Sequence, residues 1–253
     1  MDKKDKIKKE NKMSLNGKTV IVVGASGGIG RVISGELYRA GANVVLTART
    51  ENRLIAVQEE DGLDPTRSLV APADAINAKQ VANVFAATRR RFSRLGAVVI
   101  TAGGWGPRLG LDESLDQALA IAEEKMAELF LSVVGVGYAA QQSFEQQKSR
   151  GWLVHLSSHV VTNFDLPGNL AYRSAKLAAE VFLDGLAAAT PWLTVSHLRS
   201  AIVNTPETRE QWLRSPEAQA AAVQPEAIAA WIIEHFGDKT PPRIAEFKSQ
   251  VVV

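Results

Sequence analysis

Apolar stretches alternate along this chain with stretches whose apolar residues recur every three or four positions. The first kind is typical of buried strands, and the second of helices with one buried face. The predicted strands cover residues 19–23, 43–49, 68–71, 97–101, 152–157, 193–198 and 243–247. The predicted helices cover residues 31–40, 51–60, 77–92, 114–147, 171–189 and 225–236. This alternation favours an α/β fold in which a doubly wound parallel sheet binds a ligand at the carboxyl ends of its strands.

The helix predicted over residues 114–147 is unusually long. Its apolar positions form a ladder at helical spacing, Leu115, Leu119, Ala122, Met126, Leu129 and Val133. Such a ladder gives a helix one apolar face. Because of its length, we expect this helix to lend a second face to another subunit.

A glycine-rich run, Gly24-Ala25-Ser26-Gly27-Gly28-Ile29-Gly30, joins the first predicted strand to the first predicted helix. A helix N-terminus presents unpaired N–H groups and a partial positive charge, which favour a phosphate. Glycine also lets the backbone turn tightly and approach a pyrophosphate closely. Taken alone, the run is equally compatible with a flexible loop, and its spacing differs from the G-x-G-x-x-G of other dinucleotide folds.

Two polar residues follow the next two strands, where a nucleotide would extend. The second strand ends Thr47-Ala48-Arg49, without the acid that holds the 2′-hydroxyl of NAD. A guanidinium there suits a 2′-phosphate, so we expect NADP(H) to be preferred over NAD(H). The alternative is that Arg49 is a solvated surface residue. Asp74 follows the third strand near the expected adenine, or it caps the next helix.

Tyr172 and Lys176 open the helix after the fifth strand, four residues apart and therefore on one helix face. A neighbouring ammonium favours phenolate, so we expect Lys176 to lower the pKa of Tyr172. A tyrosine tuned in this way can exchange a proton with a carbonyl or alcohol oxygen. Ser157 and Ser158 end the strand, where a hydroxyl could either hold the reacting oxygen or form a turn.

Composition narrows the remaining classes. The chain has 253 residues, no cysteine and a net charge of +2. The lysine-rich segment 1–13 is expected to be a disordered basic tail, and residues 14–253 a single domain. No basic stripe with interleaved aromatic residues, apolar membrane span or secretion signal is found, so we expect no nucleic acid, no membrane and a cytoplasmic location. The four histidines are scattered without ligand spacing, so no metal site is expected.

Together these residues resemble the classical short-chain dehydrogenase/reductase family over nearly all of residues 15–253. The resemblance is carried by the order and spacing of Gly24-x-x-x-Gly28-x-Gly30, Asp74, Ala102-Gly103, Ser158 and Tyr172-x-x-x-Lys176. It implies a Rossmann-like sheet of seven strands, a nicotinamide cofactor and a small-molecule carbonyl or alcohol substrate. It also implies a homodimer or homotetramer, with helices 114–147 and 171–189 across the interface.

The resemblance assigns roles as well. Tyr172 would be the general acid or base, Lys176 would lower its pKa and bind the nicotinamide ribose, and Ser158 would hold the substrate oxygen. Thr205 would hold the nicotinamide carboxamide, and residues 205–222 would form a substrate lid. The implied cofactor-binding set is Gly24, Ser26, Gly28, Ile29, Gly30, Arg49, Asp74, Ala102, Gly103, Tyr172, Lys176 and Thr205.

The chain departs from the family pattern at several positions. Thr101 replaces an Asn after the fourth strand, and Ser200-Ala201 replaces Pro-Gly after the sixth. Ser132 replaces the Asn that positions a proton-relay water, and its single donor and shorter reach predict an altered relay. Ser158 precedes Tyr172 by fourteen residues, one more than is common in the family, so the alternative places His159 in the serine's role.

Four residues in loops beyond the strand ends are candidates for an apolar substrate pocket: Trp105, His159, Phe164 and Trp212. Ordinary packing is the alternative for each. We expect an NADP(H)-dependent oxidoreductase that interconverts a ketone and a secondary alcohol. One alternative is a 3-oxoacyl thioester reductase, for which Arg89, Arg90 and Arg91 could bind a carrier protein. Another is an NADP(H)-binding regulator with little or no turnover.

Overall fold

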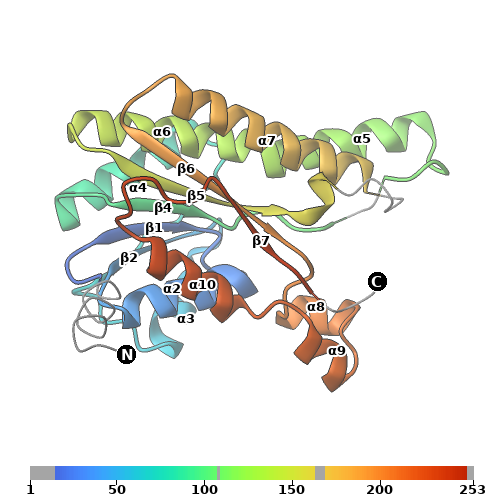
Figure 1. The fold of residues 1–253 in the computed structure, drawn as a ribbon, viewed down its shortest axis with the longest axis horizontal. Helices are drawn as coiled ribbons and strands as arrows, with labels where there is room; N and C mark the ends of the chain where they lie inside the picture. The colour runs from blue at the N-terminus through green and yellow to red at the C-terminus, as the bar shows by residue number, and fades with distance from the viewer. Residues whose placement is uncertain (1–14, 107–108, 163–168, 250–253) are drawn as a thin grey trace.

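The structure is a computed structural model that describes residues 15–106, 109–162 and 169–249. Seven parallel strands form one sheet flanked by helices (Figure 1). The strands are β1 (Thr19–Val23), β2 (Asn43–Thr47), β3 (Ser68–Val70), β4 (Ala97–Ile100), β5 (Gly151–Ser158), β6 (Leu193–Ser200) and β7 (Ile244–Phe247). The predicted α/β class and the seven-stranded parallel sheet are confirmed. The predicted basic tail, residues 1–13, lies outside the described residues.

The helices follow the predicted order with small shifts at their ends, but the helix predicted over residues 114–147 is divided, and residues 205–222 add two short helices. They are α2 (Gly28–Arg39), α3 (Glu51–Glu60), α4 (Ala78–Phe92), α5 (Leu115–Met126), α6 (Ser132–Gln146), α7 (Leu170–Ala188), α8 (Pro206–Gln211), α9 (Pro216–Ala221) and α10 (Pro225–His235). A proline occupies the first turn of α8, α9 and α10, where its missing N–H costs nothing. Within the described residues, no helix is long and apolar enough to cross a membrane.

The strand order β3-β2-β1-β4-β5-β6-β7 reverses direction between β1 and β4. Strands β1 to β3 extend to one side of this point, and β4 to β7 extend to the other. In such a sheet the loops after β1 and β4 diverge to opposite faces and leave a crevice at their carboxyl ends. The topology therefore fixes where a ligand can enter.

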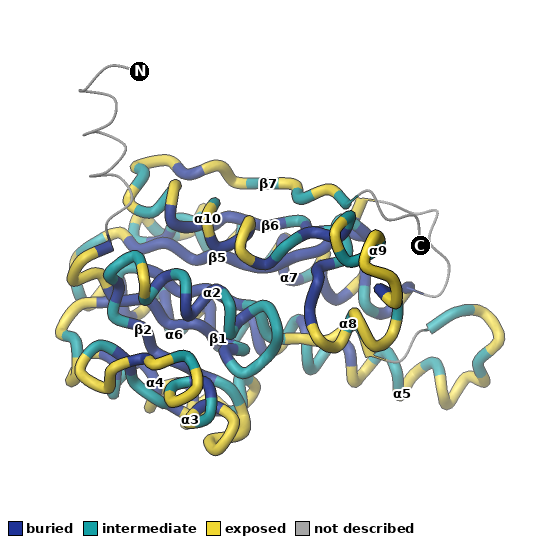
Figure 2. The backbone as a smooth tube through the Cα atoms, turned by 90° about the horizontal axis from the view of Figure 1, so that it is seen from below, coloured by how far each residue is buried: buried dark blue, intermediate teal, exposed yellow. Residues whose placement is uncertain are grey.

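Two apolar layers cover the faces of the sheet, as alternate residues of each strand point to opposite sides. Val20 and Val22 face α2, α3 and α10, whereas Ile21 and Val23 face α4, α6 and α7. Figure 1 shows these two groups of helices on opposite sides of the strands, and Figure 2 shows the strands at the centre as the most buried part of the chain.

The long helix predicted over residues 114–147 is interrupted. It begins as expected, because Ser114 caps α5 in a capping box with Gln117. Ala127–Leu131 then forms a π-helical turn, here called the π turn, before α6 begins. A π turn holds one extra residue per turn and so rotates the faces of the two flanking helices relative to each other. As a result the predicted ladder does not form one buried face: Leu129 and Val133 are buried, whereas Leu115 and Leu119 are exposed.

Candidate active site

A cleft of about 1650 Å³ opens at the carboxyl ends of the strands. All predicted cofactor and catalytic residues line it, as do the pocket residues that the structure describes: Gly24, Ser26, Gly28, Ile29, Gly30, Arg49, Asp74, Ala102, Gly103, Trp105, Ser132, Ser158, His159, Tyr172, Lys176, Thr205 and Trp212. Phe164 lies outside the described residues. The structure therefore brings together, in one cleft, residues that are up to nearly 190 positions apart in the sequence.

The glycine-rich turn leaves no room for side chains. A Cβ atom on Gly30 would lie 2.2 Å from the Gly24 carbonyl oxygen. Gly24 itself has a φ of 92°, and a Cβ there would lie 2.7 Å from the Ala102 backbone nitrogen. The turn is consequently fixed against β4, and α2 begins at Gly28 with no side chain capping its first N–H groups. These free donors and the positive end of the helix dipole fit a pyrophosphate.

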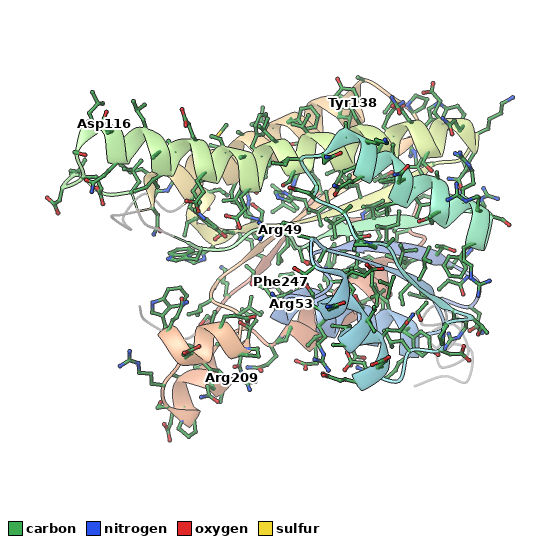
Figure 3. All side chains as sticks on the ribbon, turned by 180° about the vertical axis from the view of Figure 1, so that it is seen from behind. Arg49, Arg53, Asp116, Tyr138, Arg209 and Phe247 are labelled. Atoms are coloured by element: carbon green, nitrogen blue, oxygen red, sulfur yellow. The ribbon has the colours of Figure 1, made fainter. Side chains whose placement is uncertain are left out.

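Arg49 and Arg53 line the part of the cleft beyond β2. Figure 3 labels both, Arg49 directly after the strand and Arg53 on α3. The Arg53 guanidinium donates a hydrogen bond to the Ser26 carbonyl at 3.1 Å, which holds it beside the glycine-rich turn. Sequence reasoning missed Arg53. Its signal was a second arginine one helical turn beyond Arg49, on the helix that starts at the end of the same strand.

Asp74 lies in the cleft, and it does not cap α4. Its carboxylate accepts the backbone N–H of Ile76 at 3.2 Å, a local turn bond. The cap of α4 is Asn77, whose side chain accepts the N–H of Gln80 at 3.1 Å. Asp74 is therefore available to face a ligand.

Tyr172 and Lys176 project from the first turns of α7 toward the end of β5. The side chains of Tyr172 and Ser158 are hydrogen-bonded to each other. The buried Lys176 ammonium donates to the Leu156 carbonyl at 2.7 Å and lies 5.9 Å from the centre of the Tyr172 ring. His159 instead places Nδ1 3.2 Å from the Ser200 carbonyl oxygen. The structure thus brings Ser158, and not His159, to the tyrosine.

The expected effect of Lys176 on Tyr172 is not what the structure gives. Burial raises the pKa of Tyr172 to about 12; the hydrogen bond from Ser158 only partly opposes this, and the negative charge of Glu128 adds to it. Burial also lowers the pKa of Lys176 to about 8, against the opposing influence of Glu128 and Glu180. Desolvation is the largest influence on the pKa of both groups, because both are buried, and the ammonium is directed to a backbone carbonyl. Tyr172 is therefore a neutral phenol at pH 7, able to donate a proton.

Glu128 is a charged group in the site that the sequence did not single out. It lies on the π turn, where one carboxylate oxygen accepts the Gly104 N–H at 3.0 Å and the other accepts Lys125 Nζ at 2.7 Å. Lys125 is itself only 1% exposed. A lysine and a glutamate three residues apart on one helical segment were the available signal. The carboxylate acts on both catalytic candidates, since it raises the pKa of Tyr172 and of Lys176.

Ser132 lies one turn after Glu128, and its hydroxyl donates to the Glu128 carbonyl at 2.5 Å. A hydroxyl has one hydrogen, so Ser132 can only accept a further bond. In this structure the Ser132 hydroxyl therefore has no hydrogen left to donate to a water, and the altered relay stays a prediction. The other substituted position, Thr101, donates to the Val23 carbonyl at 3.0 Å and so ties β4 to β1.

Aromatic side chains form the wall above Tyr172. The ring centres of Trp105 and Tyr172 are 4.8 Å apart, and those of Trp105 and Trp212 are 6.0 Å apart. Trp212 follows α8, whose first turn is capped by Thr205 and Thr208. Residues 205–222 thus carry one aromatic wall of the cleft.

The histidines are less scattered in space than in sequence. His155 and His197 are paired across β5 and β6, with their Nδ1 atoms 3.3 Å apart. Among the described residues, no cluster of three or more histidine or acidic side chains could hold a metal ion.

Comparisons with known proteins agree with this geometry. A sequence model described as short chain dehydrogenase matches residues 18–215. The hydroxynaphthalene reductase-like protein Arp2 of Metarhizium robertsii is 28% identical over 175 residues, which cover 68% of this chain and 62% of that protein. The match therefore spans less than two thirds of this fungal relative.

Solved structures share the fold. A dehydrogenase/reductase from Sinorhizobium meliloti 1021 superposes with a TM-score of 0.79 at 23% identity, covering 95% of this chain and 97% of that one. An alcohol dehydrogenase from Thermococcus sibiricus, complexed with 5-hydroxy-NADP, superposes with a TM-score of 0.74 at 21% identity and covers 93% and 98%. At these identities the likeness concerns the fold alone.

Replacing Glu128 with Gln should lower the pKa of Lys176 below its value of about 8, because the carboxylate that favours the ammonium is removed. The measurement is an NMR titration of the Lys176 Cε resonance, assigned with a Lys176→Arg variant. Glu124→Gln is the matched control, since Glu124 lies 3.5 Å from the same Lys125 but is exposed. An unchanged midpoint in Glu128→Gln, or an equal shift in the control, would contradict the assigned influence of Glu128.

Proposed function

Because the chain belongs to the short-chain dehydrogenase family, we propose that it is an NADP(H)-dependent oxidoreductase that interconverts a ketone and a secondary alcohol. The observation that carries this proposal is the contact between Tyr172 and Ser158, in one cleft with Lys176 and the glycine-rich turn. The nicotinamide, when bound, supplies or accepts the hydride. This chain's own residues orient the substrate oxygen and move its proton.

Tyr172 and Ser158 act on the same oxygen atom of the substrate. Both hydroxyls are at the end of β5, so a carbonyl oxygen there can accept hydrogen bonds from both. Tyr172 then gives up its proton as the oxygen gains negative charge, which general acid catalysis requires. Lys176 stabilises the resulting phenolate, because its ammonium is buried beside the ring and water screens it little.

Arg49 and Arg53 are the proposed basis for a preference for NADP(H) over NAD(H). Two guanidinium groups beside the glycine-rich turn would provide several N–H donors for a 2′-phosphate. Among the described residues neither forms an ion pair with a carboxylate, whereas Arg31 on α2 is bound by Asp61 and Glu60. Arg49 and Arg53 are thus the arginines of this region that remain available to a ligand.

The aromatic wall supports a substrate with a flat, apolar body. Trp105 and Trp212 offer ring faces and edges next to the catalytic tyrosine. The similarity to a hydroxynaphthalene reductase-like protein is consistent with a ring-bearing ketone. The thioester alternative is less well supported, because Arg89 is bound to Gln146 and Arg91 to the carbonyls of Pro65 and Thr66.

We also propose a homodimer or homotetramer. The large apolar side chains that are exposed on α5, the π turn, α6 and α7 are Leu115, Leu119, Leu131, Tyr138, Leu170, Leu177 and Val181. These helices lie side by side on one face of the sheet (Figure 1). Apolar side chains gathered on one surface in this way mark a protein interface.

Tyr172→Phe should lower the turnover of a reducible ketone by at least about a hundredfold, since the variant keeps the ring but has no proton to give. Its NADPH affinity, followed by nicotinamide fluorescence, should stay within about threefold of the parent, because the lost hydroxyl contributes little to cofactor binding. Unchanged turnover would sink the assigned role of Tyr172. A parent enzyme that binds NADPH but reduces no ketone in a broad panel would favour the regulator.

Arg49→Ala and Arg53→Ala should each weaken NADPH binding by about ten- to a hundredfold, the loss expected for a hydrogen bond to a charged group. NADH binding should change little, because NADH lacks the 2′-phosphate. Fluorescence titration of both cofactors measures the difference, and Arg67→Ala, at the cation–π contact with Tyr38, is a control. A parent protein that prefers NADH would refute the arginine assignment and leave the family unchanged.

Val181→Lys should convert the assembly to smaller species, because it places a charge at an apolar position that is 65% exposed on α7. Ile55→Lys on α3, away from these helices, is the matched control. Sedimentation velocity distinguishes the species, and a parent protein that sediments as a monomer would exclude the proposed oligomer.

A further inference from the structure

A polar layer lies where α7 packs on β5 and β6. Ionisable residues recur at every fourth position of the helix, Tyr172, Lys176, Glu180 and Asp184, and so share one face. Opposite them, the register pairs His155 with His197 and Ser157 with Arg199. The adjoining part of the same interface is apolar. Buried polar groups are costly unless they are paired, so their arrangement requires an explanation.

In one half of this layer the polar side chains bond to one another. The Glu180 carboxylate accepts Ser157 Oγ at 2.5 Å and two guanidinium nitrogens of Arg199, at 3.1 and 2.6 Å. These bonds use both carboxylate oxygens. We therefore assign Glu180 and Arg199 to holding α7 against the two strands.

The histidine half forms an open chain. His155 Nδ1 lies 3.3 Å from His197 Nδ1, and His197 Nε2 lies 3.2 Å from an Asp184 oxygen. Asp184 is also bound by Arg243, at the edge of the sheet. The Asp184 side chain is 26% exposed, so this end of the row of hydrogen-bonded side chains reaches solvent.

The two ends of this row of hydrogen-bonded side chains determine which atom donates and which accepts at each contact. Burial acts to raise the pKa of Asp184, but the bonds to Arg243 and His197 lower it overall, so the group is an ionised acceptor. Burial lowers the pKa of both histidines, which are therefore neutral. His197 must then donate from Nε2, its Nδ1 must accept, and His155 must donate from Nδ1. The remaining nitrogen, His155 Nε2, is left with a lone pair.

That nitrogen is buried and has no hydrogen-bond partner among the described residues. The Lys176 ammonium is close enough for its charge to lower the pKa of His155. It donates one N–H to Leu156, the next residue along β5, and has two more. The open end of the histidine chain is thus an acceptor on the residue of β5 that precedes Leu156, which binds the buried donor, and a bridging water between them would complete the path.

We propose that His155, His197 and Asp184 form a proton path between Lys176 and solvent at the edge of the sheet. This inference rests on the proposed function of Tyr172 and Lys176. It supplies a route that does not use Ser132, whose only hydrogen is bonded to the Glu128 carbonyl.

The proton balance is as follows for oxidation of an alcohol. Tyr172 starts as the neutral phenol. Lys176 passes an N–H proton to His155 Nε2, the Nδ1 proton of His155 moves to His197, and the Nε2 proton of His197 moves to Asp184 and solvent. The Lys176 amine then takes the phenol proton of Tyr172, and the phenolate takes the hydroxyl proton of the substrate as the substrate carbon gives up a hydride, which a bound cofactor would accept. Each transfer leaves both imidazoles in the opposite tautomer, so both must return to the first tautomer before the next proton leaves. Reduction starts from the opposite tautomers and moves a proton inward.

NMR tests the donor and acceptor assignments of the proton path without enzyme turnover. The imidazole nitrogens should show a protonated Nε2 on His197 and a protonated Nδ1 on His155. Lys176→Met should move the His155 Nε2 resonance and leave that of His235 in place. The opposite tautomers, or a His155 resonance that does not respond, would overturn the path.

Kinetics tests its use. His197→Gln and Asp184→Asn should slow alcohol oxidation by roughly tenfold, below the usual contribution of a full acid–base catalyst. The solvent isotope effect on kcat should rise and the substrate-deuterium effect should fall, with KM and cofactor affinity nearly unchanged, because proton release becomes limiting. Asp184→Asn is the milder variant, since its side chain lies at the surface.

The matched control is His235→Gln, because His235 forms an equivalent pair with Asp238 at 2.9 Å on α10. Equal isotope effects in parent and path variants would mean that the layer is structural only. In that case a Tyr172→Phe variant that is still inactive would leave the proposed function standing. An enzyme that oxidises no alcohol would instead refute the proposed function, and the NMR result would then decide on the donor and acceptor assignments alone.

Discussion

The burial of one ammonium group determines the electrostatics of the cleft. Lys176 lies between α7 and β5, where it can reach the Leu156 carbonyl and where water cannot stabilise its charge. The groups around it follow from this: Glu128 and Glu180 favour the charged form, and the buried histidine behind it stays neutral. A group held near a pKa of about 8 can lose and regain a proton at physiological pH. Tyr172, with its pKa raised to about 12, stays protonated in the same pH range.

The sheet determines where this ammonium meets a cofactor. Gly30 packs closely on Gly24, so that only the tight turn 24–27 separates the end of β1 from the start of α2. Parallel pairing then brings the ends of β4 and β5 to the same edge. Side chains far apart in sequence therefore meet in one cleft. Backbone hydrogen bonds between the strands align the strand ends, and no additional side-chain contact is needed for this alignment.

Much of this was predictable from local rules. The glycine spacing, the four-residue separation of Tyr172 and Lys176, and the strand alternation each depend on a few neighbouring residues. What failed depends on the full environment. The direction of the Tyr172 pKa shift depends on the burial of the phenol, which residue spacing does not reveal. The positions of Arg53 and Glu128 in the site could be predicted only from knowledge of which helix faces turn inward. The π turn altered that facing between Met126 and Ser132, where a regular helix was expected.

The pairing of His155 with His197 shows why such features escape sequence reasoning. The two residues are 42 positions apart, and only the β5–β6 register makes them neighbours. An interface made for packing alone would continue the apolar pattern of Leu153 and Val195, which flank the histidines on the same strand faces. Replacing that pattern with a hydrogen-bonded chain sacrifices hydrophobic burial in a layer where Glu180 and Arg199 already hold the helix. The row of hydrogen-bonded side chains has its acceptor end toward Lys176 and its carboxylate toward solvent. Packing does not require this direction, whereas proton movement does.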